Sequence, residues 1–446
     1  MYIDNGLLSY CWKHKFLGDD LSTTEGRHLV IHDAGLYNKK DGTFFNAKLK
    51  IDNCLFVGNV VVLKNASDWY VKRYDQNDKY RNTTLLVVLN DDSVVLSDGE
   101  KIPILKTEIP ERVERNANAL MSADGDVLCH QHIMQYNSRL LRHAWLAAMQ
   151  TEFLEEESSY LKSFYEECGK DMELTFFCAI LRAFGFNVCK TEMDLLARNL
   201  SLPALEHHRD DLFQIEAFLM GQAGLLTLEP DVQCAVPEKY HKDALNEGYF
   251  ARLRNEWLYL SHKYTLKGPL SCLCWHPYGS GGWKYPHVII SMLANWYYCR
   301  KMDSVSALNV KTAKEAMNLF NTHCTPYWET HFMFGAVSRK SEKHLSNDRK
   351  AWLIMAGLVP FLFFCGRLKN DEELCDRAFD FMEQVKTFST TETKHFKKYG
   401  LVPEDAGETL ALTHMKTAYC NHQWKPTIDT RECLRCRFGL QFIKNH

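Results

Sequence analysis

The chain has 446 residues, a formal net charge of -3, and a composition that is 46% hydrophobic and 12% aromatic. This length allows two or three domains with packed cores. The nearly balanced charge neither favours nor excludes nucleic acid, because only a local patch of one sign would matter.

No run of 18 or more apolar residues is present, so the sequence predicts no membrane-spanning segment. The longest apolar stretch, "LIMAGLVPFLFFCG", contains Pro360 and is better explained as a buried helix. The first residues lack a basic region followed by an apolar one, so no signal peptide is predicted. Sixteen cysteines without the spacing of a small disulfide-rich domain indicate a reduced, cytoplasmic protein.

Residues 1–125 are expected to form a β-rich domain. "NGLLSYCWKHKF" predicts a leading helix, and short apolar runs such as "RHLVIHDAG", "TFFNAKLKI" and "TTLLVVL" are separated by turn residues. "LLVVLNDDSVVLSDG" predicts a hairpin with "NDD" as its turn. In "LFVGNVVVLK" both alternating faces are apolar, which is typical of a strand in the middle of a sheet covered on both sides.

Residues 136–446 change to long segments with apolar residues at helical spacing, such as "HAWLAAMQTEFLEEESSYLKSFYEEC". They predict a large all-α domain that ends in a cysteine-bearing segment, 415–446. The fold class is therefore α+β, with a domain boundary expected between about residues 115 and 136.

Several long phrases resemble one bacterial family, the domain-of-unknown-function family 2851. They include "EHHRDDLFQIEAFLMGQAGLL", "WETHFMFG", "VPFLFFCGRLKNDEELCDRAFDFMEQVK" and "YCNHQWKPTIDTRECLRCRFG", with "NAKLKID", "VGNV" and "ASDWY" near the start. The resemblance covers nearly the whole chain, but the family is uncharacterised and implies no activity by itself.

The first-domain pattern of that family is similar to the PD-(D/E)XK nuclease core, a mixed α/β fold. In such a core, an Asp and a Glu on neighbouring strands hold Mg²⁺, which stabilises charge during phosphodiester cleavage. This sequence departs from the pattern at every position that the resemblance implies. Those positions are Thr43 for the Asp, Val61 for the Glu, and Leu63, Tyr74 and Leu86 for histidines. The resemblance therefore implies a degenerate nuclease core with no catalytic residues and no magnesium.

Two other interpretations of this strand pair remain open. The strands can be an ordinary buried sheet, or a metal site can be rebuilt from other acids. The acids available for that purpose are Glu25, Asp41, Asp52 and Asp68.

The C-terminal cysteines give the strongest chemical signal. Cys433 and Cys436 have the Cys-x-x-Cys spacing of a metal-binding turn, and Cys420 lies upstream. A fourth ligand must come from elsewhere. The resemblance to the family favours Cys129, and His132 and His422 are the alternatives. Zinc and an iron–sulfur cluster both suit this set, while three reduced structural cysteines without a metal are the other interpretation.

We therefore expect a catalytically degenerate, nuclease-like protein that acts as a binding or scaffold module. An active metal-dependent nuclease with relocated ligands, and a protein with a purely structural zinc or iron–sulfur site, are the alternatives. The sequence leaves the partner open between nucleic acid and another protein, and it predicts no association with a membrane.

Overall fold

The computed structural model describes residues 5–38, 42–97, 99–121, 129, 133, 139–228, 236–275, 285–299, 302–420, 433 and 436–445. The chain divides into two compact units. The first comprises residues 1–141 and 415–446, and the second comprises residues 142–414. A sheet-rich region followed by a largely helical one confirms the α+β class.

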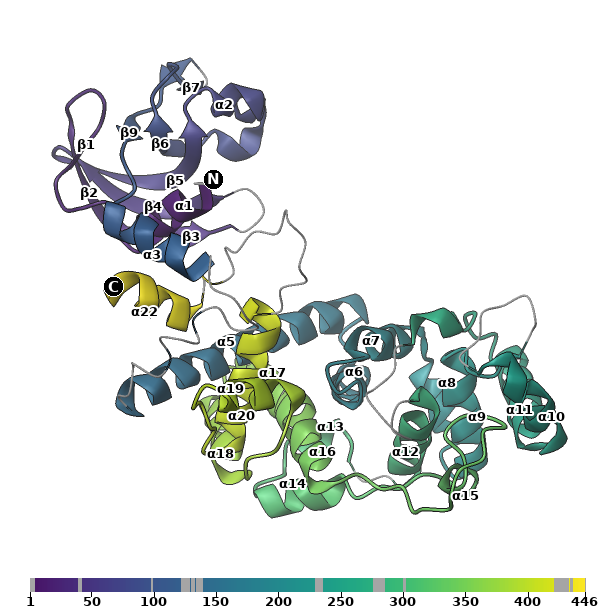
Figure 1. Cartoon of the computed structure of the whole chain (residues 1–446). Helices are drawn as coiled ribbons and strands as arrows, with labels where there is room; N and C mark the ends of the chain where they lie inside the picture. Colours follow the sequence, from purple (N-terminus) through teal and green to yellow (C-terminus); the bar gives the residue numbers. More distant parts are fainter. Residues whose placement is uncertain are drawn as a thin grey trace. The chain divides into compact units, whose positions relative to one another are not determined.

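The first unit is built on a seven-stranded sheet with the order β1-β2-β4-β5-β6-β9, in which β3 also pairs with β4 (Figure 1). Its elements are α1 (Asn5–Lys13), β1 (Leu21–Ser22), β2 (His28–Asp33), β3 (Leu36–Tyr37), β4 (Thr43–Ile51), β5 (Cys54–Asn65), α2 (Asp68–Val71), β6 (Thr83–Asn90), β7 (Leu96–Ser97), β8 (Glu100–Lys101), β9 (Ile104–Lys106), α3 (Glu111–Met121) and α22 (Arg437–Asn445).

Strands β2, β4 and β5 pair antiparallel, whereas β6 joins β5 in parallel after the short helix α2. Gly58 permits the close approach of β6. A Cβ atom there would lie 2.3 Å from the Thr84 methyl group and 2.9 Å from the Asn82 carbonyl. A side chain at position 58 would therefore push the two strands apart.

Strand β5 has hydrophobic core on both of its faces, as the sequence predicts. Val60 and Val62 pack with Trp12 of α1 on one face, and Val61 and Leu63 belong to a separate cluster on the other face. The first residues of the strand differ from the prediction, because Cys54–Val57 are exposed at the end of the β4–β5 hairpin.

The hairpin predicted across "NDD" is wrong. Strand β6 pairs with β5 and β9, both in parallel, and the residues after the turn form β7, which pairs with β8. The apolar run before "NDD" forms β6, an inner strand of the sheet. Its two neighbouring strands, β5 and β9, both run parallel to it, so neither can be the second strand of a tight hairpin.

The C-terminal segment does not belong to the helical domain in which the sequence analysis put it. Helix α22 packs against α3, and the Asn116 side chain donates a buried hydrogen bond of 3.1 Å to the Ile443 carbonyl. The division also falls at residue 141 rather than between 115 and 136. Helical periodicity predicts an apolar face on α22, but it does not predict that this face packs against α3 of the first unit.

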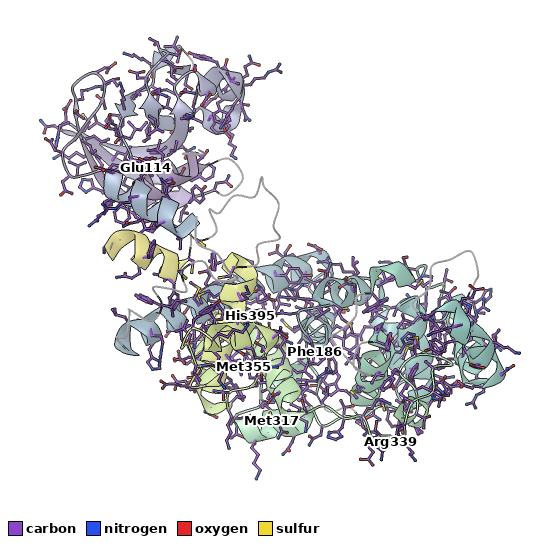
Figure 2. The ribbon with its side chains drawn as sticks, viewed as in Figure 1. Glu114, Phe186, Met317, Arg339, Met355 and His395 are labelled. Carbon is purple, nitrogen blue, oxygen red and sulfur yellow. The ribbon has the colours of Figure 1, made fainter. Side chains whose placement is uncertain are left out.

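The second unit is helical (Figure 2). Its hydrophobic core contains residues from most of its helices. Its elements are α5 (Arg139–Glu167), α6 (Met172–Phe184), α7 (Lys190–Asn199), α8 (Leu202–Glu206), α9 (Leu212–Gln222), α10 (His241–Asn246), α11 (Tyr249–Lys263), α12 (Pro286–Tyr298), α13 (Ser304–Ala307), α14 (Ala313–Leu319), α15 (Pro326–Glu329), α16 (Asn347–Leu353), α17 (Val359–Lys369), α18 (Glu372–Gln384), α19 (Thr391–Lys397) and α20 (Ala406–Met415).

Helices α16 and α17 are continuous through one π-helical stretch, Ile354–Leu358. Of the described residues, this single helix, Asn347–Lys369, is long and apolar enough to cross a membrane, yet 83% of its apolar window is buried inside the protein. Met355 within it has no exposed surface. The stretch is thus a core helix, as expected from the sequence.

Candidate functional site

Four cysteines, Cys129, Cys420, Cys433 and Cys436, belong to the first unit, and none of them is more than 8% exposed. Burial raises the pKa of the Cys129 thiol well above its ordinary value, and the charges of the other three thiols raise this pKa further. Burial raises the pKa of Cys420 in the same way, with additional contributions from Cys436 and Cys433. Segments far apart in the sequence therefore place the Cys129 and Cys420 thiols within electrostatic range of those of Cys433 and Cys436.

The Cys-x-x-Cys pair forms a tight turn at the start of α22. The Cys436 amide donates to the Cys433 carbonyl at 3.3 Å, and the Cys436 carbonyl accepts from the Leu440 amide at 2.8 Å. Gly439 lies directly against this turn, because a Cβ atom there would be only 2.0 Å from the Cys433 carbonyl oxygen. The turn is thus held against the first turn of a helix.

The donor chemistry of this cluster fits a soft metal centre. Thiolates bind zinc and the iron of iron–sulfur clusters, whereas magnesium requires oxygen ligands. Four buried thiols cannot all ionise beside one another without a cation, because each negative charge opposes the next. The alternative ligands His132 and His422 lie outside the described residues.

The positions implied for the nuclease metal ligands lie on adjacent strands and in register. Thr43 of β4 is paired with Val61 of β5, and Val61 is paired with Leu86 of β6. All three side chains are completely buried. The structure therefore brings these positions together on neighbouring strands, although none of them carries a carboxylate or an imidazole.

The remaining two positions, Leu63 and Tyr74, belong to the same hydrophobic cluster. Tyr74 stacks on Tyr80 with ring centroids 3.9 Å apart and meets the edge of Trp69 at 5.7 Å. Aromatic side chains thus form part of the hydrophobic cluster on this face.

The described acids that could rebuild a metal site have local structural contacts. Asp52 lies in the β4–β5 turn with a positive φ of 53° and accepts the His28 amide at 2.9 Å. Asp68 accepts the Asn65 amide at 3.1 Å. Glu25 pairs with Arg27 and Lys101, whose hydrogen bonds lower the pKa of its carboxyl group. Asp41 lies outside the described residues.

The second unit contains a buried carboxyl group that the sequence analysis did not single out. Glu216 of α9 is 1% exposed and accepts hydrogen bonds from Tyr249 at 2.9 Å, from Thr325 at 3.2 Å and from the Trp328 indole. Burial raises the pKa of Glu216, while these donors oppose the increase. Glu216 and Trp328 come from two of the phrases that carry the family resemblance, "LFQIEAFLMGQ" and "WETHFMFG".

A buried histidine lies beside the same tryptophan. His287 of α12 is completely buried, and among the described residues neither ring nitrogen has a hydrogen-bond partner. Its ring lies 5.6 Å from that of Trp328 and 5.3 Å from that of Phe334. Burial lowers the pKa of His287 to about 3, so the imidazole is neutral at physiological pH.

The raised pKa of Glu216 predicts a pH-dependent stability. The folded-state pKa exceeds the ordinary value of 4.5, so protonation favours the folded state. The contribution of Glu216 is complete below about pH 4.5 and is lost as pH rises through the folded-state pKa. We expect the unfolding free energy of wild type, relative to Glu216→Gln, to increase as pH falls from 7 to 4.5. Urea titrations at both pH values measure it, and a constant difference would contradict the assignment.

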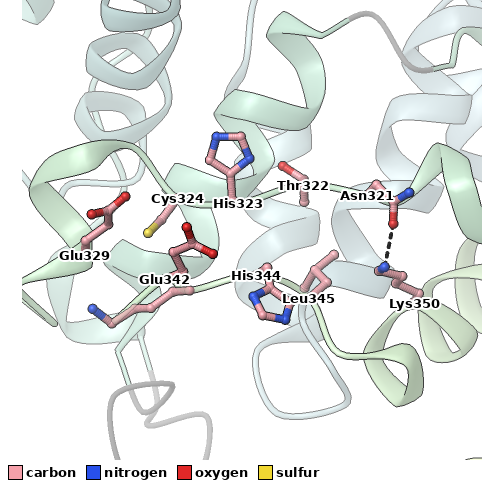
Figure 3. A pocket seen from close by; sticks show the side chains of 10 residues that line it. Asn321, Thr322, His323, Cys324, Glu329, Glu342, His344, Leu345 and Lys350 are labelled. Carbon is pink, nitrogen blue, oxygen red and sulfur yellow. Dashed lines mark hydrogen bonds between the residues drawn. The ribbon is translucent and has the colours of Figure 1, made fainter. Parts of the chain in front are cut away.

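A cavity of about 450 Å³ lies in the second unit, between the segments 321–324 and 342–345 (Figure 3). Its lining residues are Asn321, Thr322, His323, Cys324, Glu329, Glu342, Lys343, His344, Leu345 and Lys350. Lys343 is turned toward the protein and donates to the carbonyls of Trp328 and His331. Acids and bases are mixed around this cavity, so its charge selects neither an anion nor a cation.

The sequence profile of a family described as "Protein of unknown function (DUF2851)" matches residues 5–389. The chain belongs to this family. No curated protein and no solved structure matches the chain. The matched residues include the sheet, the apolar face at Val61 and the buried Glu216, whereas Cys420, Cys433 and Cys436 lie beyond them.

Proposed function

We propose that this member of the DUF2851 family acts by binding rather than by catalysis. In this proposal, the first unit is a nuclease-like fold that has lost its chemistry, and a structural metal centre closes it. The observation that carries the proposal is the register of Thr43, Val61 and Leu86, three buried side chains on adjacent strands, none of which can ligate a hard cation through a charged oxygen.

The metal centre in this proposal consists of Cys129, Cys420, Cys433 and Cys436. Four protein ligands would saturate a tetrahedral zinc ion and leave no position for a substrate, so the role is structural. The metal would join the end of the chain to the segment that follows the sheet. Because thiols persist in reducing compartments, a cytoplasmic location is part of the proposal.

Nucleic acid is the ligand class that we favour for the first unit. Exposed basic side chains lie at the end of β5 and along the crossover to β6: Lys64, Lys72, Arg73, Lys79 and Arg81. The same crossover also carries Asp68, Asp75 and Asp78, and Asp78 pairs with Arg81 at 3.0 Å. Basic side chains bind phosphates without reading a sequence, and a nuclease-like unit without catalytic acids would retain such contacts. A partner protein is the other class, and fluorescence anisotropy with labelled DNA and RNA at low and high salt separates the two.

The proposal predicts no metal-dependent cleavage. Purified protein incubated with DNA or RNA and millimolar Mg²⁺ or Mn²⁺ should release no more product than matched buffer, because the implied ligand positions are apolar or neutral. Gel electrophoresis of end-labelled substrates measures this result. Cleavage that is lost in Asp41→Ala or Asp68→Ala would instead support a nuclease with relocated ligands.

A further inference from the structure

The first and last helices of the second unit, α5 and α20, contact each other through side chains. Gly407 of α20 faces α5, since a Cβ atom there would lie 2.7 Å from the side-chain amide nitrogen of Gln150. Further along both helices, the ring of Phe153 meets that of His414 edge-on at 5.6 Å. The position of the His414 ring is therefore set by packing between the two helices.

Three metal-ligating side chains converge at this point. A carboxylate oxygen of Glu152, one of Glu156 and a ring nitrogen of His414 all lie within 4.8 Å of one another. Glu152 and Glu156 are one helical turn apart, so both carboxylates extend from the same face of α5. His414 is only 8% exposed and reaches them from α20.

The distances in this cluster suit a shared ion better than a direct contact. His414 Nε2 is 3.9 Å from Glu152 Oε1, which is too long for a hydrogen bond. Among the described residues, no lysine or arginine forms an ion pair with Glu156, and its side chain is exposed. A divalent ion bound by all three groups would neutralise the charges of the two carboxylates.

We infer that Glu152, Glu156 and His414 form a binding site for a divalent cation that prefers oxygen and nitrogen ligands, such as Mn²⁺. An octahedral ion held by three protein atoms keeps water at its other positions. The ion would link α5 to α20. These oxygen and nitrogen ligands differ in kind from the four cysteine thiols, so the two sites would select different metals. The inference therefore does not depend on the proposed function.

The test is a titration of metal-free protein with Mn²⁺, in which electron paramagnetic resonance measures the concentration of free Mn²⁺ at each step. We expect one saturable site in wild type and an affinity at least about tenfold lower in Glu156→Gln, because one of three protein ligands loses its charge. Glu156 is exposed, so this variant should fold, which circular dichroism checks.

Glu166→Gln is the matched control. Glu166 is also exposed on α5, and the substitution removes the same charge away from the cluster, so Mn²⁺ affinity should not change. Cys433→Ser should also bind Mn²⁺ normally, which separates this site from the cysteine centre. Absence of saturable binding at millimolar Mn²⁺, or equal affinity of Glu156→Gln and wild type, would overturn the inference.

Discussion

If the four cysteines hold a metal as proposed, Cys433→Ser is expected to lose that metal and to lower the melting temperature of the first unit by about 10 °C. Structural metal ions contribute directly to folding free energy, and loss of one thiolate from a set of four weakens that contribution by about 3 kcal/mol. The effect should be confined to the first unit, because all four cysteines belong to it. Elemental analysis measures the metal, and calorimetry measures the transition.

Cys11→Ser provides a control with matched burial. Cys11 lies in α1 of the same unit and has no exposed surface, but it is not one of the four clustered thiols. Its replacement places a hydroxyl group in a hydrophobic core and should cost some stability, yet the metal content should remain that of wild type. If wild type contains neither zinc nor iron, or if Cys433→Ser retains the full amount, the metal centre is wrong.

The pH dependence of metal binding should follow from the thiol chemistry. Burial and neighbouring thiols raise the pKa of Cys129 and Cys420, so protons compete strongly with the metal for these ligands. Metal binding must therefore release protons, and affinity should fall as pH is lowered. Competition with a chelator between pH 6 and 8 measures this slope.

Local patterns in the sequence predicted features that depend on neighbouring residues. The run around Val61 is apolar on both faces, and this alternation alone indicated a strand with core on both sides. The Cys433 and Cys436 spacing likewise indicated a turn, which the 3.3 Å hydrogen bond between them bears out. Both features span only a few residues, where strand and turn geometry are closely constrained.

Features that join distant segments were missed. Glu152 and Glu156 are visible as a helical pair, but nothing in the sequence indicates that His414 reaches them from another helix. Glu216 lies in an apolar helix, and its donors Tyr249 and Trp328 come from two other segments. In the same way, the docking of α22 on α3 depends on tertiary packing that helical periodicity does not encode.

Val61→Glu is expected to destabilise the first unit by about 4 kcal/mol at neutral pH, because burying a carboxylate without a partner is costly. Val61 has no exposed surface and is surrounded by the Leu63, Trp69 and Leu86 cluster. Val57→Glu is the matched control on the same strand, since Val57 is 53% exposed and the same charge there stays in water.

The pH dependence of Val61→Glu has a definite sign. Burial would raise the pKa of the new carboxyl group above its unfolded value, so the neutral form favours folding and the defect should shrink as pH falls toward 4.5. Urea unfolding of Val61→Glu and Val57→Glu at pH 7 and pH 5 measures both effects. Equal stability of the two variants at pH 7 would show that this face accommodates an acid and would reopen the alternative of a working metal site.

The double variant Thr43→Asp, Val61→Glu tests whether the sheet retains the geometry of a nuclease. The two positions are directly opposite each other in the β4–β5 register, so their carboxylates would face the same space. If the fold is nuclease-like, millimolar Mg²⁺ should restore part of the lost stability of the double variant, because the ion neutralises both charges. The ion should have no such effect on Val61→Glu alone. A double variant that Mg²⁺ does not stabilise would mean that this face is ordinary hydrophobic core rather than a former metal site.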